Sequence, residues 1–138
     1  MTLDVELLHH VTLTSSDLER SRAFYRDILG LVEIERPPFP FPGAWFRIGS
    51  GQQLHLIVHD RATYRASAEI DSRDVHFAVR VPDYAYAVTF LRSQGYSDDP
   101  ASPSGPRMRL QPRGTAGFPQ IYILDPDRHV IEINAAHL

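Results

Sequence analysis

Hydrophobic and polar residues alternate along several short segments of the chain, and this period of two predicts β-strands. The first such segment, ELLHHVTLT at 6–14, places apolar side chains on one face and His10 on the other. A helix is predicted to follow at once, because apolar residues recur at helical spacing and Ser16 and Glu19 have the S-x-x-E form of a capping box. Gly30 stands where a helix C-terminal cap belongs.

The same order of predicted elements occurs twice. Strand-like segments at 31–35, 44–48 and 53–58 complete a first β-α-β-β-β module. A polar linker precedes the second module, whose strand DVHFAVRV leads into a helix capped by Asp83 and closed by Gly95. The last three strands are predicted at 107–111, 119–124 and 129–134. A repeated unit of this size indicates that neither copy buries its apolar face alone. The chain is therefore predicted to be a single domain over 1–138, with module 1 at about 5–60, a linker at 61–72 and module 2 at about 73–136.

Aligning the two modules brings four chemically capable residues into register. His10 aligns with His76 in the first strand of each module, and His55 aligns with Glu132 in the fourth. Each lies on the less apolar face of its strand, opposite apolar residues such as Val11 and Leu13 for His10 and Ile131 and Ile133 for Glu132. With the helices covering the apolar faces, three imidazoles and one carboxylate are predicted to project from the opposite, concave side of the sheet.

These four residues form the predicted metal site. A single histidine in a strand is more often a hydrogen-bonded structural residue than a ligand, and a single carboxylate is more often solvated or paired with arginine. Four of them at equivalent positions of a repeat are not independent, which favours a site made of His10, His55, His76 and Glu132. Imidazole and carboxylate donors suit one borderline divalent ion, Zn, Ni, Fe(II), Co or Mn, better than Ca or Mg. The remaining histidines fall outside this pattern: His9, His59, His129 and His137.

The same alternation supplies candidates for substrate binding, namely Arg47, Arg109 and Tyr122. Arginine holds a carboxylate or oxyanion bidentately, and the tyrosine hydroxyl can donate a hydrogen bond to an oxygen at the metal. For each, the alternative is an ordinary strand residue. The segment PPFPFPG, with Phe39 and Phe41, is interpreted either as a lid over the site or as an exposed connection.

Composition excludes several classes of protein. The chain has 138 residues, of which 43% are hydrophobic, enough for one core. A formal charge of -3 and a pI near 6.1 provide no basic field for nucleic acid. The absence of cysteine excludes thiolate metal sites and cysteine nucleophiles. No signal peptide and no apolar run long enough for a bilayer are present, so we expect a cytoplasmic protein without a membrane partner.

Three motifs resemble those of the vicinal oxygen chelate superfamily, which includes glyoxalase I, methylmalonyl-CoA epimerase, extradiol dioxygenases and the fosfomycin and bleomycin resistance proteins. They are LHHVTLTSSDLERSRAFYRDILGL for the opening strand and helix, VHFAVRVPD for the second opening strand, and YILDPDRHVIEI for the closing hairpin. The resemblance covers nearly the whole chain. It implies an α+β fold of two βαβββ modules, a cupped mixed sheet around a metal with the helices outside, and a homodimer. It also implies that His10, His76 and Glu132 occupy the three shared ligand positions.

The resemblance leaves the role of His55 open. Glyoxalase I has a glutamate at this position and the epimerase a glutamine, so His55 is either a fourth ligand or an acid or base beside the metal. Without His55, the other three residues form the two-His, one-carboxylate triad of non-haem Fe(II) oxygenases. Glu132 is the second predicted catalytic group.

Three hypotheses about function follow. The first is a metal-dependent, glyoxalase-like lyase or isomerase acting on a small-molecule substrate that is chelated through two neighbouring oxygens. The second is an Fe(II) extradiol-type dioxygenase. The third is a non-catalytic drug- or metabolite-binding protein like the bleomycin resistance proteins.

Overall fold

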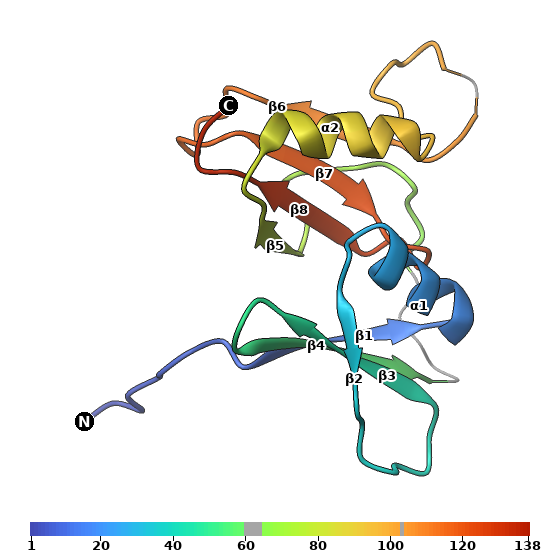
Figure 1. The fold of residues 1–138 in the computed structure, drawn as a ribbon, viewed down its shortest axis with the longest axis vertical. Helices are drawn as coiled ribbons and strands as arrows, with labels where there is room; N and C mark the ends of the chain where they lie inside the picture. The colour runs from blue at the N-terminus through green and yellow to red at the C-terminus, as the bar shows by residue number, and fades with distance from the viewer. Residues whose placement is uncertain (60–64, 103) are drawn as a thin grey trace. The chain divides into compact units, whose positions relative to one another are not determined.

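A computed structural model describes residues 1–59, 65–102 and 104–138 of the chain (Figure 1). The chain divides into two compact units, Met1–Tyr64 and Arg65–Leu138. Each unit contains a four-stranded mixed sheet and one helix, so the predicted α+β fold of two βαβββ modules is confirmed. The boundary between the units falls inside the predicted linker 61–72, and residues 61–64 of that linker lie outside the described residues.

The first unit has the strand order β1-β4-β3-β2, in which β1 and β4 are parallel and the other neighbours antiparallel. Its elements are β1 (His10–Ser15), α1 (Leu18–Asp27), β2 (Val32–Ile34), β3 (Gly43–Ile48) and β4 (Gln52–Val58). The first strand is shorter than the predicted 6–14. Because the register sets His10 opposite Gln53, near the start of β4, the preceding residues have no strand to pair with, and residues 1–9 are exposed.

The first helix begins one residue later than the capping-box pattern predicts. Asp17 is the N-cap: its backbone is extended, and its carboxylate accepts a hydrogen bond from the Arg20 backbone N–H at 3.1 Å. Ser16 therefore lies outside the helix, because an aspartate at the next position serves equally well as a cap. Gly30 follows the helix with φ of +68°, a conformation that glycine adopts without strain.

One face of the first sheet is apolar and packs against α1. Ala44, Phe46, Leu54 and Leu56 are almost completely buried there, and Tyr25 of α1 is fully buried with them. Burying each large side chain of this kind stabilises the unit by roughly 1.5–3 kcal/mol. The opposite face carries the polar and aromatic residues of β1, β3 and β4, as the alternation predicts.

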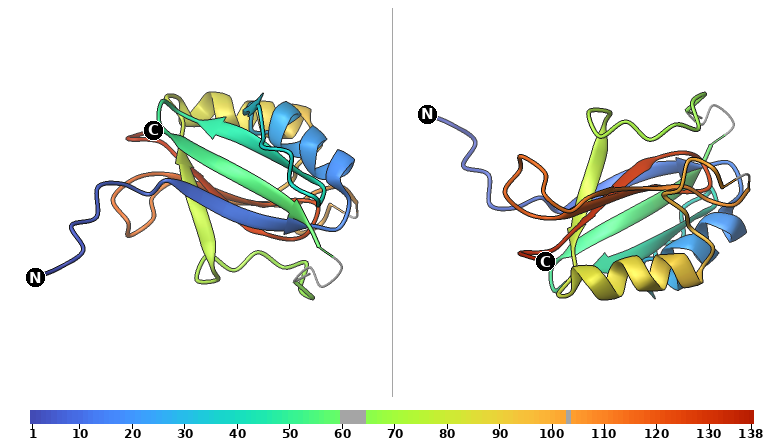
Figure 2. Two further views of the ribbon diagram at one scale, coloured as in Figure 1. Left: turned by 90° about the horizontal axis from the view of Figure 1, so that it is seen from below. Right: turned by 90° about the horizontal axis from the view of Figure 1, so that it is seen from above.

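The second unit repeats this arrangement with the strand order β5-β8-β7-β6. Its elements are β5 (His76–Arg80), α2 (Tyr84–Ser93), β6 (Met108–Gln111), β7 (Gln120–Leu124) and β8 (Val130–Asn134). Asp83 caps α2 as predicted, accepting a hydrogen bond from the Tyr86 backbone N–H at 2.8 Å. Figures 1 and 2 show α2 alongside the strands of its own unit, and its buried residues include Val88 and Leu91. The apolar face of this sheet is formed by Ile121, Ile123, Ile131 and Ile133.

The strand pairing confirms that the two units are registered alike. In the first, His10 pairs with Gln53, two residues before His55. In the second, His76 pairs with Val130, two residues before Glu132. In both units a histidine of the opening strand therefore shares its face of the sheet with the candidate residue of the fourth strand, one step along the pleat.

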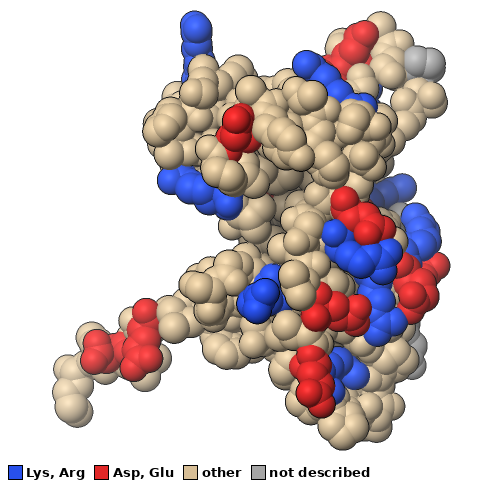
Figure 3. All heavy atoms as spheres, in the orientation of Figure 1, with Lys and Arg blue, Asp and Glu red and all other residues tan. Residues whose placement is uncertain are grey.

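The outer surface of α1 carries charges of both signs, which Figure 3 shows interspersed rather than gathered into one patch. Arg22 forms ion pairs with Glu19 and Glu33, and Arg26 pairs with Asp27. Such exposed pairs each contribute little to the free energy of unfolding. Neither helix in the described part of the chain has the length and hydropathy to cross a lipid bilayer.

Candidate metal and substrate site

The second unit brings His76 and Glu132 into direct contact. His76 opens β5, Glu132 lies in the adjacent parallel strand β8, and the His76 Nε2 and Glu132 Oε2 atoms are 3.2 Å apart. Glu132 is only 6% exposed, so its charge is largely removed from water. A buried carboxylate is tolerated only when neighbouring groups compensate for the lost hydration.

Two amide side chains compensate one oxygen of Glu132 and leave the other available. Gln120 Nε2 donates to Glu132 Oε1 at 2.6 Å, and Asn134 Nδ2 donates to the same oxygen at 3.3 Å. Both donors come from strand positions beside Glu132 on the same face. These hydrogen bonds hold Oε1 and leave Oε2 facing His76, the kind of second layer that orients metal ligands.

The hydrogen bond on the far side of the His76 ring fixes which nitrogen carries the proton. His76 Nδ1 lies 2.7 Å from the Asp74 carbonyl oxygen, which can only accept, so Nδ1 is the donor. A neutral His76 then directs the lone pair of Nε2 at the carboxylate oxygen Oε2, and two acceptors face each other. A proton between the two atoms, or a metal ion bound by both, resolves this conflict.

The spacing of these two atoms also suits a shared ion. Bonds of about 2.1 Å from one metal to nitrogen and oxygen ligands, at tetrahedral or octahedral angles, place the two ligand atoms roughly 3.0–3.4 Å apart. The observed 3.2 Å between His76 Nε2 and Glu132 Oε2 lies within this range. The donor set and its geometry therefore fit a divalent metal of the borderline class.

Tyr122 and Arg109 extend the polar face from this pair. In the strand register Glu132 is opposite Tyr122, and Tyr122 is opposite Arg109. The Tyr122 ring meets His76 edge to face, with 5.6 Å between the ring centroids. Burial raises the pKa of the Tyr122 hydroxyl, Glu132 raises it further, and Arg109 opposes the rise. Tyr122 is therefore a protonated hydrogen-bond donor at neutral pH.

The first unit stacks His55 between two other rings. The His55 ring lies parallel to Trp45 with 3.9 Å between centroids, and the His10 ring lies on its other side at 4.2 Å. His55 Nε2 is 2.7 Å from Gln53 Oε1, which accepts its hydrogen bond. Burial, followed by the charges of neighbouring cations, lowers the pKa of His55 to about 4. His55 is thus neutral at physiological pH.

The stacking bears on whether His10 and His55 can bind the same ion. Their ring planes are only 18° apart, so the in-plane lone pairs of the two imidazoles run nearly parallel and do not converge. Simultaneous coordination of one metal requires at least one ring to turn. His9, which the alternation assigns to the other face, contacts His10 through Nδ1 atoms that are 2.8 Å apart. His9 precedes the first residue of β1, although its carbonyl still accepts a hydrogen bond from the Gln53 backbone N–H of β4 at 3.1 Å.

Arg47 and the proline-rich segment flank this stack. Arg47 is opposite Gln53 in the register and exposed. The segment is anchored at its end, because the Val58 backbone N–H donates to the Pro42 carbonyl at 3.0 Å. Arg36 donates to the Phe41 carbonyl at 2.9 Å, and its guanidinium lies over the rings of both Phe39 and Phe41. These contacts give the connection between β2 and β3 a defined structure.

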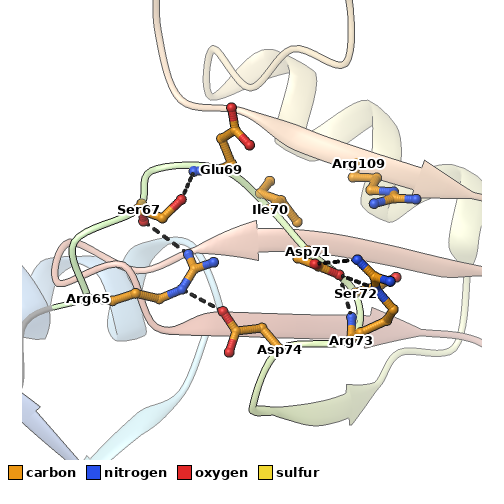
Figure 4. A pocket seen from close by; sticks show the side chains of 9 residues that line it. All are labelled: Arg65, Ser67, Glu69, Ile70, Asp71, Ser72, Arg73, Asp74 and Arg109. Carbon is orange, nitrogen blue, oxygen red and sulfur yellow. Dashed lines mark hydrogen bonds and ion pairs between the residues drawn. The ribbon is translucent and has the colours of Figure 1, made fainter.

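The predicted metal ligands thus come together as two pairs, His10 with His55 and His76 with Glu132. No group of three or more histidine, aspartate or glutamate side chains suited to a metal ion is found within the described residues. The sequence does not predict a cavity in the second unit. A cavity of about 500 Å³ in the second unit is lined by Arg109 and by residues between Arg65 and Asp74, most of them in the predicted linker (Figure 4). In the sequence, the only sign that residues 65–74 are structured is the close spacing of their opposite charges.

Comparison with known proteins identifies the class to which this fold and these residues belong. The model of the Glyoxalase/Bleomycin resistance protein/Dioxygenase superfamily matches residues 7–133, and the chain belongs to this family. The resemblance seen in the three sequence motifs is thereby confirmed.

Individual relatives are distant. Glyoxylase I 4 of Arabidopsis thaliana is 26% identical over 133 residues, covering 95% of this chain and 71% of the relative. A putative glyoxalase family protein from Bacillus anthracis superimposes with a TM-score of 0.74 at 22% identity, covering 98% of both chains. Lactoylglutathione lyase from Agrobacterium tumefaciens gives a TM-score of 0.64 at 22% identity and covers 96% of this chain and 95% of its own. The fosfomycin resistance protein FosX from Listeria monocytogenes gives 0.67 at 21% identity, with coverage of 97% and 96%. These structures share the fold.

Proposed function

We propose that this chain is a metal-dependent enzyme of the glyoxalase type, a lyase or isomerase that acts on a small substrate bound through two neighbouring oxygens. His10, His76 and Glu132 are the proposed ligands of one divalent ion. The observation that carries the proposal is the His76–Glu132 pair, in which Nε2 and Oε2 face each other at 3.2 Å while Nδ1 is committed to a carbonyl. Membership of a superfamily in which divalent metal binding is general supports it.

The ion, when bound, supplies Lewis-acid polarisation of the substrate oxygens and stabilises the anion that forms when a proton is removed. The protein residues do the rest. Gln120 and Asn134 orient Glu132 through hydrogen bonds to Oε1, so that Glu132 serves as ligand and as the carboxylate nearest the transferred proton. Tyr122, kept protonated by its raised pKa, donates a hydrogen bond to a substrate oxygen. Arg47 and Arg109 are the proposed contacts for anionic parts of the substrate.

His55 is proposed to position His10 rather than to bind the ion or transfer a proton. Its ring is parallel to that of His10, and its Nε2 is hydrogen-bonded to Gln53. With a pKa of about 4 it is a weak base at neutral pH and carries no acidic proton to donate. Its contribution is a fixed, neutral surface against which the His10 imidazole is held.

A second candidate is Fe(II)-dependent ring cleavage of a catechol. This candidate is favoured by the stacking of His55 on His10 and its hydrogen bond to Gln53, which keep His55 off the metal. The remaining two histidines and one carboxylate are the ligand set of non-haem Fe(II) oxygenases. The two candidates differ in metal and substrate. Ferrous iron with cleavage of a catechol supports the dioxygenase, whereas activity with Ni, Zn or Co on a thiol adduct or 2-oxo substrate supports the lyase or isomerase.

Metal analysis of the purified protein tests the proposal directly. We expect one ion per chain in the wild type and its loss in His10→Ala, His76→Ala and Glu132→Gln, each with an unchanged far-UV circular dichroism spectrum. His137→Ala is the matched control, because this histidine is exposed near the C-terminus. A stoichiometric ion retained by Glu132→Gln removes Glu132 from the ligand set. A wild-type protein that binds none of the five metals favours the non-catalytic binding protein.

Trp45 provides an independent readout, because it is the only tryptophan in the chain. It stacks on His55, which in turn stacks on His10. Binding of Co(II) or Ni(II) at His10 should therefore quench Trp45 fluorescence, with a midpoint that matches the metal affinity measured by equilibrium dialysis. Quenching that persists in His10→Ala places the ion elsewhere.

A further inference from the structure

The cavity in the second unit is lined by one arginine, Arg109, that forms no hydrogen bond or ion pair with the residues described by the structure. Arg65 Nε pairs with Asp74 Oδ2 at 2.7 Å, and Arg73 pairs with both carboxylate oxygens of Asp71 at 3.0–3.1 Å. These contacts cancel four of the charges that line the cavity (Figure 4). Arg109 makes no hydrogen bond or ion pair with any residue that the structure describes, and it is exposed.

The one remaining acid of the cavity does not neutralise this arginine. Glu69 also lines the cavity, and Figure 4 shows no hydrogen bond or ion pair between its carboxylate and Arg109. Asp71, the nearer acid, is already held by Arg73 through two hydrogen bonds. The charges of Arg109 and Asp71 act on each other, but no hydrogen bond between them is found. The guanidinium donors of Arg109 therefore remain open to a ligand, beside a volume of about 500 Å³, a size typical of small-molecule sites.

Arg109 also lies in line with the proposed metal ligand. Arg109, Tyr122 and Glu132 are successive partners across β6, β7 and β8, so their side chains project from the same face. Neighbouring strands are about 4.8 Å apart, which places the Cα atoms of Arg109 and Glu132 roughly 10 Å from each other. The opposing effects of Glu132 and Arg109 on the pKa of Tyr122 show that both charges act on the hydroxyl between them.

We propose that Arg109 binds a carboxylate of the substrate at the far end of this row, so that the substrate is a small organic acid with a second carboxylate. That carboxylate is separated by a short carbon chain from the two neighbouring oxygens that face His76 and Glu132. The inference rests on the proposed function and specifies its substrate class. A guanidinium holds a carboxylate through two parallel hydrogen bonds. The singly charged carboxylate is favoured over a phosphate dianion because Glu69, which is not among the paired acids of the cavity, repels a higher charge more strongly.

Two 2-oxo acids of equal chain length test this assignment. 2-Oxoglutarate and 2-oxopentanoate share the oxo and carboxylate oxygens that chelate a metal, and only the former has a second carboxylate. Affinities are measured by isothermal titration calorimetry on the cobalt-loaded protein and on the protein stripped with EDTA. The variants are Arg109→Gln, Arg109→Lys and, as a control with the same loss of charge, Arg20→Gln. Arg20 is exposed on α1 in the other unit.

We expect the wild type to bind 2-oxoglutarate about tenfold more tightly than 2-oxopentanoate, the gain of a charge-assisted hydrogen-bonded pair. Arg109→Gln should abolish this preference, Arg109→Lys should keep part of it, and Arg20→Gln should retain it fully. Equal affinity for the two acids in the wild type, or an unchanged preference in Arg109→Gln, overturns the assignment of Arg109. The comparison of loaded with stripped protein tests the proposed function separately, because an Arg109-dependent preference without any effect of cobalt supports the anion site and contradicts the metal site.

Discussion

Acidification of the metal-free protein should lower its free energy of unfolding through His55. The folded protein resists protonation of this ring because it is buried between Trp45 and His10 and lies near other cationic groups, and its pKa falls from 6.5 to about 4. In the unfolded chain the same imidazole returns to its ordinary pKa. Protons therefore bind the unfolded state preferentially as the pH falls, and linkage requires a loss of stability.

The sign and the size of the effect follow from these two values. Above pH 6.5 His55 is neutral in both states and contributes nothing. Between pH 6.5 and 4 the unfolded state holds a proton that the folded state does not, and the free energy of unfolding declines by about 1.4 kcal/mol per pH unit. Below pH 4 both states are protonated and the decline ends at about 3 kcal/mol.

Urea denaturation at pH 7 and pH 5, in the presence of EDTA, measures the effect. The wild type should lose about 2 kcal/mol more than His55→Gln between these two conditions, because the variant lacks the titrating group. The fluorescence of Trp45 gives a second measurement, since an imidazolium stacked on indole quenches its emission. Quenching should occur with a midpoint near pH 4. A fluorescence midpoint near pH 6.5, or equal pH dependence in the two proteins, refutes the conclusion that burial keeps His55 neutral.

Three further changes test the local structure. Asp17→Ala should lower the free energy of unfolding by about 1 kcal/mol in urea denaturation through loss of the helix cap, and an unchanged free energy contradicts the assigned cap. Gly43→Ala should cause a large drop in Tm, because its Cβ would lie 2.4 Å from a carbonyl oxygen of β4, while Gly51→Ala has open space and should be tolerated; equal Tm values would show that β3 and β4 can shift apart. Gln120→Ala should weaken metal binding about 10–100-fold in equilibrium dialysis by removing the 2.6 Å hydrogen bond to Glu132, and unchanged affinity would mean that this support is dispensable.

The sequence predicts the fold and the faces of the strands well, because both depend on local patterns. Alternation with period two decides which face a strand residue occupies, and the repeat supplies an internal check. The pairing of His10 with Gln53 and of His76 with Val130 reproduces the alignment of the two modules. The boundaries of the strands are less predictable. The N-terminal start of β1, for example, depends on where its partner β4 begins and not on any residue of β1 itself.

The chemistry of the candidate residues depends on partners that the sequence does not specify. Nothing in the pattern distinguishes His55, stacked between two rings with a pKa of about 4, from His76, whose Nδ1 is committed to the Asp74 carbonyl. The pattern gives both as strand histidines on a polar face. Their different environments arise from Trp45 on the neighbouring strand and from the turn that precedes β5, and both contacts form only on folding.

From Arg65 onward, the segment predicted to be a linker is ordered by ion pairs in the structure. Polar composition predicts a solvated connection, yet Arg65 and Asp74 close this stretch on itself with an ion pair of 2.7 Å. The pairing uses up the charges that would otherwise compete for Arg109. In addition, the Asp74 backbone carbonyl fixes the tautomer of His76. The same residue therefore orders the wall of the cavity through its side chain and orients a proposed metal ligand through its main chain, so a change at Asp74 is expected to affect both the proposed anion site and the proposed metal site.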